Sequence, residues 1–128
     1  MKANELMLGD WVVYEGDVDY INPIKIEGMD VATGMCVTTD RDDVGFDGVW
    51  PIPLTKEILE KNGFVRETNI GMVLNHDDYD IIYDTFEHEL RILEYKKMIL
   101  DIEYFGDCSV HELQHALRLC NIDKEIEL

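Results

Sequence analysis

The feature of this sequence that most constrains its fold is a series of short apolar runs bounded by glycine, aspartate or proline. Trp11–Tyr14 and Met35–Thr39 are rich in β-branched and aromatic residues, which suit a pleated, half-buried surface. Tyr20–Ile26 is expected to form a further strand, and Pro23 within it places that strand at an edge or a bulge. Short strands at this spacing predict a small N-terminal β-barrel-like, SH3-like arrangement or a curled sheet.

A second group of strands is expected in the C-terminal half, as an antiparallel meander joined by short polar turns. The predicted strands are Met72–Leu74, Tyr79–Tyr83, Leu90–Tyr95 and Met98–Phe105. The last is the clearest, because its apolar residues alternate with a second set that includes acidic ones. Residues 86–95 also fit helical spacing, so strand and helix both stay open there, with strand preferred.

Two short helices are expected to pack on the meander. The first, over 56–62, begins after Thr55 as its N-cap. It ends at Gly63, which supplies the left-handed residue that follows many helices. This is a helix of about two turns.

The second helix, expected over 110–120, has the clearest local signature in the chain. Ser109 at the N-cap and Glu112 three residues later form a capping box. Its apolar residues recur at helical spacing and should form one stripe buried against the sheet. They are Val110, Leu113, Leu117 and Cys120. Asn121 should end the helix, and 122–128 either pairs as an edge strand or frays.

These elements predict an α+β fold class in two parts. Residues 1–53 would form the barrel-like subdomain and 54–128 the α+β subdomain, whose antiparallel strands span 72–105; one compact domain is the alternative. The segment 40–48 is acidic and contains glycine, so it is expected to be a loop. Residues 49–53 should be extended, because two prolines hold them rigid.

The charge of the chain limits the classes of partner that it can bind. Its 128 residues include 28 acidic and 11 basic side chains, which gives a formal net charge of −17, and 46% of them are apolar. This charge repels phosphate backbones and anionic lipid headgroups, so direct binding to nucleic acid or membranes is not expected. There is no apolar run of about 18 residues and no signal-peptide pattern, which predicts a cytoplasmic protein.

The cysteines give no sign of a redox or metal site. Cys36, Cys108 and Cys120 are odd in number and lack C-x-x-C spacing. We expect reduced, semi-buried thiols. Cys108 lies near His111 in the sequence but has no evident partner to orient that histidine, and no phosphate-binding loop or G-x-S-x-G motif occurs.

One run resembles a catalytic motif. Residues 111–115 read His-Glu-Leu-Gln-His, which matches the H-E-x-x-H pattern. In that pattern two histidines on one helical face bind zinc and the glutamate activates a water molecule. A zinc hydrolase is therefore one hypothesis for this chain.

The surrounding sequence does not favour zinc. The longer zinc-protease signature needs glycine where Arg118 stands and histidine where Asn121 stands. Glu112 already has a role in the capping box. We therefore expect His111 and His115 to lie partly exposed beside the buried stripe, and we assign no catalytic, cofactor-binding or metal-ligating residue and no cofactor.

Two acidic segments could hold calcium weakly. Asp40–Asp43 and Asp77–Asp80 each place three carboxylates within four residues. Neither has the glycine and terminal glutamate of an EF-hand loop, so solvated loops are expected at both places.

Three segments together resemble a known group of proteins. They are Met1–Leu6 with Leu8–Val12, Pro51–Phe64 and Val110–Gln114. Their order and spacing resemble a family of uncharacterised small proteins from Bacteroidetes genomes, prophages and other mobile elements, and the resemblance spans nearly the whole chain. His111, Leu113 and Gln114 match the family pattern, in which the position of His115 is often asparagine. The resemblance implies a phage-related or mobile-element accessory protein, without an agreed activity.

Three functional hypotheses follow from the sequence. The leading one is a non-enzymatic protein-interaction module whose strands present a surface to another protein, with homo-oligomerisation as a further expectation. The first alternative is an acidic decoy or inhibitor that mimics nucleic acid. The second is the zinc hydrolase. The sequence leaves the partner, the oligomeric state and the strand order open.

Overall fold

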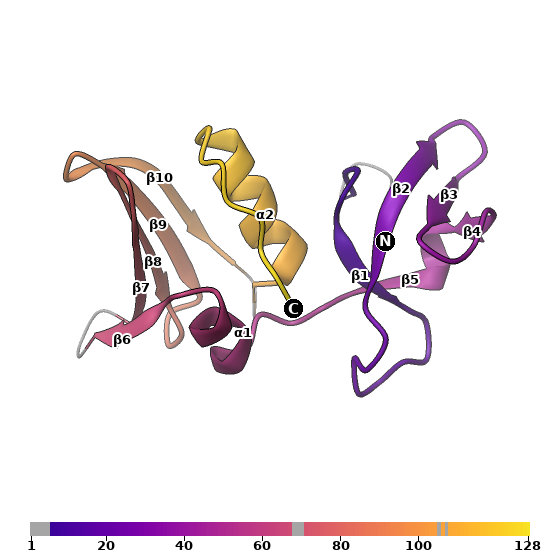
Figure 1. Ribbon diagram of the computed structural model, residues 1–128, viewed down its shortest axis with the longest axis horizontal. Helices are drawn as coiled ribbons and strands as arrows, with labels where there is room; N and C mark the ends of the chain where they lie inside the picture. The colour runs from indigo at the N-terminus through magenta and orange to yellow at the C-terminus, as the bar shows by residue number, and fades with distance from the viewer. Residues whose placement is uncertain (1–5, 68–70, 105, 107) are drawn as a thin grey trace. The chain divides into compact units, whose positions relative to one another are not determined.

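The structure is a computed structural model that describes residues 6–67, 71–104, 106 and 108–128. Within these residues the chain is mainly β. Two five-stranded antiparallel sheets are accompanied by two helices and one short 3-10 turn (Figure 1).

Contacts along the chain divide it into two compact units. The N-terminal unit comprises the chain up to Ile52 together with Ser109–His115. The C-terminal unit comprises Pro53–Cys108 and Ala116–Leu128. A short segment from late in the sequence therefore groups with the N-terminal strands, which the spacing of apolar residues did not indicate.

The N-terminal unit is built on a sheet with the strand order β4-β3-β2-β1-β5. Its strands are β1 (Trp11–Tyr14), β2 (Ile24–Asp30), β3 (Met35–Thr38), β4 (Val44–Gly45) and β5 (Val49–Pro51). All pairings are antiparallel, and the predictions of β1 and β3 are confirmed. Among the described residues the outer strands β4 and β5 each pair with one neighbour, so the sheet is open and is not a closed barrel.

Strand β2 differs from the prediction in its start and its position. The expected strand over 20–26 was wrong, because the strand begins at Ile24, directly after Pro23. Proline has no N–H to donate to a neighbouring strand, so the ladder starts after it. β2 pairs with both β1 and β3 and is not an edge strand, although its pairing with β3 shifts register between Ile26 and Gly28.

The segment 40–48 is not the simple loop that its acidic composition indicated. It contains β4 and the 3-10 turn η2 (Phe46–Gly48). Val44 and Phe46 are 8% and 7% exposed, so two apolar side chains anchor this acidic stretch in the interior. The local composition did not predict the burial of these two side chains, because this burial depends on the strands beside them.

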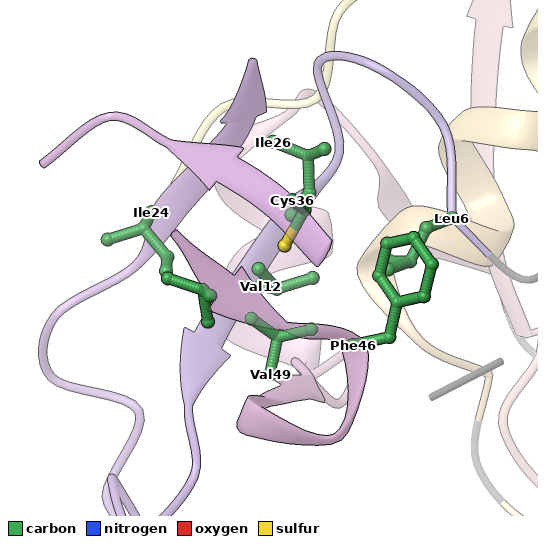
Figure 2. Packing of buried hydrophobic residues seen from close by; sticks show 8 residues of the cluster. Leu6, Val12, Ile24, Ile26, Cys36, Phe46 and Val49 are labelled. Atoms are coloured by element: carbon green, nitrogen blue, oxygen red, sulfur yellow. The ribbon is translucent and has the colours of Figure 1, made fainter. Parts of the chain in front are cut away.

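An apolar cluster fills the interior of the N-terminal unit (Figure 2). Its members come from every strand of the sheet, from the turn η2 and from the chain before β1: Leu6, Val12, Ile24, Ile26, Cys36, Val44, Phe46 and Val49. Alternate residues of a strand point to one face, which is why Ile24 and Ile26 both reach this cluster. Tyr14 and Met29 pack against it and are partly buried.

The C-terminal unit contains the second sheet, with the strand order β10-β9-β8-β7-β6. Its strands are β6 (Val65–Glu67), β7 (Gly71–His76), β8 (Tyr79–Asp84), β9 (Glu89–Glu94) and β10 (Lys97–Glu103). Each strand pairs with the next in sequence, so the predicted antiparallel meander is confirmed. The predicted end of the last strand, at Phe105, lies outside the described residues. Strand β6 was not predicted, because all of its residues are exposed and give no alternating pattern.

Residues 86–95, where strand and helix were both open, form a turn followed by β9. Leu90 and Ile92 are fully buried and the intervening Arg91 is not, which is the period of a strand. Phe86 lies in the turn with 90% of its surface exposed. The helical spacing of its neighbours was therefore coincidental.

Helix α1 (Lys56–Lys61) confirms its prediction, apart from ending one residue early. The Thr55 hydroxyl accepts a hydrogen bond from the Ile58 N–H at 3.2 Å, and Gly63 has φ 91°. Asn62 at the end of the helix binds the C-terminal tail: its amide donates to the Glu127 carbonyl at 2.7 Å and its oxygen accepts from the Glu127 N–H at 2.8 Å.

The tail itself was predicted as an edge strand or a frayed end, and both expectations were wrong. No strand is formed over 122–128, yet Ile122 and Ile126 are 3% and 2% exposed. The Arg118 guanidinium lies 3.7 Å from the Glu125 carboxylate. Two buried side chains and the contacts with Asn62 and Arg118 therefore order the tail without strand pairing.

Helix α2 (Val110–Leu119) also confirms its prediction, apart from ending one residue early. Val110, Leu113 and Leu117 are fully buried, as predicted for the stripe, but its fourth member, Cys120, lies just past the helix and is only half-buried. Asn121 has φ 58°, and two backbone hydrogen bonds close the helix: Asn121 to Arg118 at 3.0 Å and Ile122 to Leu117 at 2.8 Å. This is the Schellman arrangement, with asparagine as the left-handed residue.

Candidate functional site

The start of helix α2 is closed by the predicted capping box. The Ser109 N–H donates to Glu112 Oε1 at 3.0 Å, and the Glu112 N–H donates to Ser109 Oγ at 3.3 Å. The Ser109 hydroxyl also donates to Glu112 Oε1 at 2.8 Å. The Glu112 carboxylate thus satisfies the helix start and interacts favourably with the helix dipole.

His111 is part of the same hydrogen-bond network. Its Nδ1 lies 3.0 Å from Ser109 Oγ. Because the one hydroxyl proton of Ser109 is directed at Glu112, the serine oxygen accepts in this contact and the proton belongs on His111 Nδ1. His111 is only 5% exposed, so the prediction that it would be partly exposed was wrong. A buried imidazole needs a polar partner, and the cap supplies one.

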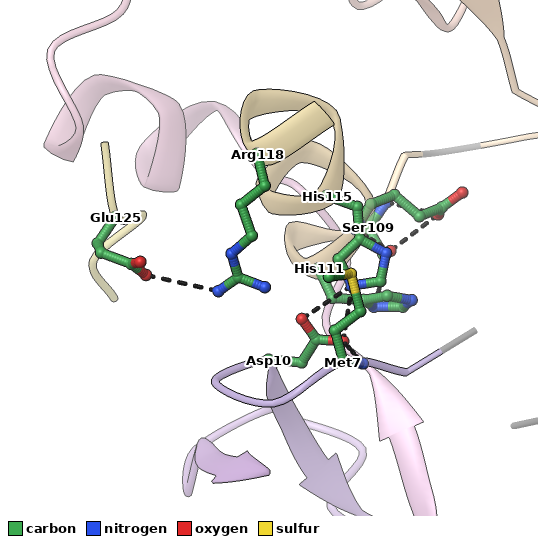
Figure 3. Close-up of polar contacts among 8 residues, drawn as sticks. Met7, Asp10, Ser109, His111, His115, Arg118 and Glu125 are labelled. Carbon is green, nitrogen blue, oxygen red and sulfur yellow. Dashed lines mark hydrogen bonds and ion pairs between the residues drawn. The ribbon is translucent and has the colours of Figure 1, made fainter. Parts of the chain in front are cut away.

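His115 makes a hydrogen-bonding contact with a residue far away in the sequence. Its Nε2 lies 2.9 Å from Asp10 Oδ1 and 2.8 Å from Asp10 Oδ2 (Figure 3). Asp10 precedes β1, is completely buried, and also accepts a hydrogen bond from the Met7 N–H at 2.7 Å. The ring of His111 meets that of His115 edge to face, with centroids 5.4 Å apart. His115 is partly exposed as predicted, but it holds a buried carboxylate rather than standing beside the stripe without a role.

This geometry uses His115 Nε2 and the Glu112 carboxylate, two groups that a zinc centre of this type would need, for hydrogen bonds within the protein. In an H-E-x-x-H site both imidazoles coordinate the metal and the glutamate faces a metal-bound water. Here His115 Nε2 faces Asp10 and Glu112 completes the helix cap. Among the residues that the structure describes, no three His, Cys, Asp or Glu side chains are grouped to hold a metal ion. Through the contact between His115 and Asp10, the motif connects the start of α2 to the segment before β1.

Sequence reasoning missed Asp10, which it assigned only to a turn. The residue lies 105 positions from His115, so no local spacing joins them. A buried aspartate requires a partner because desolvation of its charge is costly, but burial is not visible in the sequence.

The three cysteines are free thiols, with Cys36 and Cys108 buried and Cys120 half-buried. Burial raises the pKa of Cys36. Burial and, to a smaller extent, the nearby Glu94 carboxylate raise the pKa of Cys120. A raised pKa keeps a thiol protonated and weakly nucleophilic, which favours a structural role for both.

The acidic segment at 40–43 is tied to β1 by side-chain contacts. The Tyr14 hydroxyl donates to Asp40 Oδ1, and the Thr38 hydroxyl donates to the same oxygen at 3.2 Å. These contacts, the Tyr14 bond above all, hold the pKa of Asp40 below its usual value. The Arg41 guanidinium lies 4.0 Å from the centre of the Tyr14 ring. The Asp40 carboxylate is thus hydrogen-bonded by two side chains of the protein.

The second acidic segment, Asp77–Asp80, which comprises the turn between β7 and β8 and the first two residues of β8, is similar. The Tyr95 hydroxyl donates to Asp78 Oδ2 at 2.9 Å, and the Lys96 ammonium donates to Asp80 Oδ2 at 2.8 Å. Two of its carboxylates are therefore paired across the neighbouring hairpin. Neither acidic segment assembles a set of oxygen ligands that would suggest calcium.

A different feature stands out on the surface of the N-terminal unit. The connection between β1 and β2, Glu15–Pro23, which we call the β1–β2 loop, reaches beyond the ends of both strands (Figure 1). It exposes three large apolar side chains: Val18 by 67%, Tyr20 by 40% and Ile21 by 69%. The sequence analysis placed Tyr20 and Ile21 in a strand, so their exposure in a loop was not predicted.

Hydrogen bonds hold the β1–β2 loop in one conformation. The Asp17 carboxylate accepts from the Ile21 N–H at 3.2 Å and from the Asn22 N–H at 2.9 Å. The Tyr20 N–H donates to the Asp17 carbonyl at 3.2 Å, and Tyr20 adopts φ 54°, which is uncommon for an aromatic residue. The Val18 N–H donates to Gly16 at 2.9 Å. The apolar side chains are thus presented by an ordered backbone.

Comparison of the chain with protein-family models, with curated proteins and with solved structures finds no match in any of the three. Neither helix in the described part of the chain has the length and apolar character that crossing a membrane requires.

Proposed function

We propose that this chain is a non-enzymatic protein-interaction module and that the β1–β2 loop is its contact surface. The proposal includes a phage-related or mobile-element origin and a cytoplasmic setting, which the sequence suggested. It also treats the N-terminal sheet as a curled, SH3-like scaffold that holds the loop.

The observation that carries the proposal is the ordered exposure of Val18 and Ile21. Full burial of a side chain of this size contributes about 1.5–3 kcal/mol of favourable free energy. Because Val18 and Ile21 are mostly exposed, most of that free energy is not gained within the chain. Tyr20 in addition holds a backbone conformation that costs free energy and is maintained by Asp17. Residues that are costly to fold and exposed to water are typical of contact surfaces, where a partner buries them.

The non-enzymatic part of the proposal is supported by the network at the start of α2. His111, Glu112 and His115 carried the hydrolase hypothesis, and each contributes to the helix cap or to the contact with Asp10. Their arrangement is accounted for by stability alone, so no catalytic role is needed to explain it.

The test is a comparison of proteins captured from a lysate of Bacteroidetes host cells by immobilised wild-type chain and by the double variant Val18→Ser/Ile21→Ser. Both substitutions leave the backbone hydrogen bonds of the loop available, because the Val18 and Ile21 N–H groups make them. We expect quantitative mass spectrometry to find a partner that the wild type retains and the double variant loses.

Val31→Ser is the matched control. Val31 is also a valine in a turn of the N-terminal sheet and is 66% exposed, so its substitution removes apolar surface outside the β1–β2 loop. The control should capture the partner as well as the wild type does. Equal capture by wild type and the loop double variant would contradict the proposal.

A further inference from the structure

We infer that the partner of the β1–β2 loop is a basic protein surface with an apolar centre, a conclusion that rests on the proposed function. The loop's charged side chains all carry the same sign: Glu15, Asp17 and Asp19 are acidic, and 15–23 contains no lysine, arginine or histidine. Glu15 and Asp19 are exposed, on either side of Val18 in the sequence.

The arrangement matches the usual anatomy of a contact between proteins. Such contacts have an apolar centre that becomes fully desolvated and a polar rim that stays near water. In the loop, Val18 and Ile21 provide the apolar part and the exposed carboxylates provide a negative rim. Arginine and lysine side chains on the partner would pair with that rim and accelerate association.

Charge also argues against a second copy of this chain as the occupant. Two loops facing one another would bring Glu15, Asp17 and Asp19 of each copy together, and like charges about 4 Å apart repel by about 1 kcal/mol per pair even in water. The net charge of −17 adds to this repulsion. The same charge disfavours nucleic acid, whose phosphates are negative.

The binding chemistry can be tested without the natural partner by titrating isotope-labelled protein with three synthetic nine-residue peptides. One alternates arginine and leucine, one alternates arginine and glycine, and one alternates glutamate and leucine. We expect the arginine–leucine peptide to shift the amide signals of Gly16–Asn22. The arginine–glycine peptide should bind at least about tenfold more weakly, and the glutamate–leucine peptide should leave these signals unchanged.

Variants then separate the apolar part from the charged part. Val18→Ser/Ile21→Ser should weaken binding of the arginine–leucine peptide about tenfold. Glu15→Gln/Asp19→Asn should weaken its binding to the same extent at low salt but have little effect on it at high salt. Val31→Ser should bind as the wild type does. Circular dichroism of each variant checks that the fold is retained.

Three results would overturn the inference. The first is equal binding of the arginine–leucine and arginine–glycine peptides, because charge alone would then suffice, as for a nucleic-acid mimic. The second is a shift pattern centred on 40–43, the other acidic segment of the N-terminal unit. The third is a dimer in light scattering that Val18→Ser/Ile21→Ser dissociates, because a second copy would then be the occupant.

Failure of the basic-partner inference can be distinguished from failure of the proposed function. If the loop double variant loses its captured partner but Glu15→Gln/Asp19→Asn and high salt do not weaken capture, the interaction module stands and the basic partner is wrong. If the loop double variant captures every protein that the wild type does, the interaction module itself is wrong.

Discussion

His115 Nε2 and the carboxylate of Asp10 lie 2.8 Å apart although 105 residues separate them in the sequence. The pair joins the second half of an H-E-x-x-H run to a completely buried aspartate before the first strand. A run that resembles a catalytic motif thereby stabilises the position of the start of α2 within the N-terminal unit. A buried carboxylate with one partner removed is costly, which makes this contact a sensitive test of the account.

Replacing Asp10 should destabilise the chain strongly. Asp10→Ala removes the acceptor for both His115 and the Met7 N–H and should lower the free energy of unfolding by about 2–4 kcal/mol. Asp10→Asn keeps one acceptor oxygen and should cost less. Urea denaturation followed by circular dichroism measures both. An Asp10→Ala variant as stable as the wild type would show that the pair does not hold the structure.

The capping box provides a second measurable contribution. Ser109→Ala removes the acceptor for the Glu112 N–H and the partner of His111 Nδ1, and should cost about 1–2 kcal/mol of stability. Glu112→Gln preserves an oxygen at the same place and should cost less. If Glu112→Gln proved the more damaging of the two, the charge of Glu112 would matter beyond the cap.

The pH dependence of stability should reflect Asp84, which caps the turn between β8 and β9. Its Oδ1 accepts from the Phe86 N–H at 2.9 Å and from the Glu87 N–H at 3.1 Å, and these bonds, the one from Glu87 first, hold the pKa of Asp84 below its ordinary value. A depressed pKa stabilises the fold above the pKa of the unfolded chain, and this contribution disappears as pH falls through the folded value.

Acid titrations of wild type and Asp84→Asn, followed by circular dichroism, check this prediction. The variant should be less stable near neutral pH and should lose less of its stability on acidification than the wild type. Identical acid profiles would show that the turn does not depend on the ionised carboxylate.

At the other end of β8, the phenol of Tyr79 should lose its proton at a higher pH than an ordinary tyrosine. A hydrogen bond to Glu94, its partner across β8 and β9, raises the pKa of Tyr79 to about 12, with burial as the next cause. The raised value means that this contact stabilises the fold below the ordinary tyrosine pKa and stops doing so as pH rises through about 12.

Ultraviolet absorbance titrations of wild type and Tyr79→Phe isolate this phenol by difference. Glu94→Gln should lower its pKa toward the ordinary value, and it should also speed alkylation of Cys120, whose thiol pKa the same carboxylate raises. A Tyr79 titration unaffected by Glu94→Gln would contradict the pairing.

Hydrogen exchange should report the order of the β1–β2 loop. The amides of Ile21 and Asn22 donate to the Asp17 carboxylate, so Asp17→Ala should accelerate their exchange. The amides of Ala32 and Thr33 donate to Asp30 in a similar turn and serve as an internal control, since they should keep their wild-type rates. Unchanged exchange at Ile21 and Asn22 would mean that the loop is not held by Asp17.

Much of the fold could be predicted because its signals are local. The cap at Thr55, the capping box at Ser109 and the alternation in β10 each lie within a few residues, and the structure confirms the corresponding helices and strand. β4 and the buried Phe46 were missed because their environment is created by strands distant in sequence.

The surface features were harder to predict for the same physical reason. Tyr20 and Ile21 have strand-forming side chains, and only the Asp17 contacts and Pro23 show why the strand starts later. Asp10 gave no sign of its partner, because the contact with His115 forms across 105 residues. Sequence patterns identified the residues of the H-E-x-x-H run and could not say what they contact.

Hydrogen–deuterium exchange of the wild-type chain, with and without the partner captured from the lysate, shows whether the proposed contact surface, the β1–β2 loop, is the part of the chain that the partner covers. We expect the added protection to be concentrated in the amides of 16–22. Protection elsewhere, with 16–22 exchanging as in the free chain, would contradict the proposal.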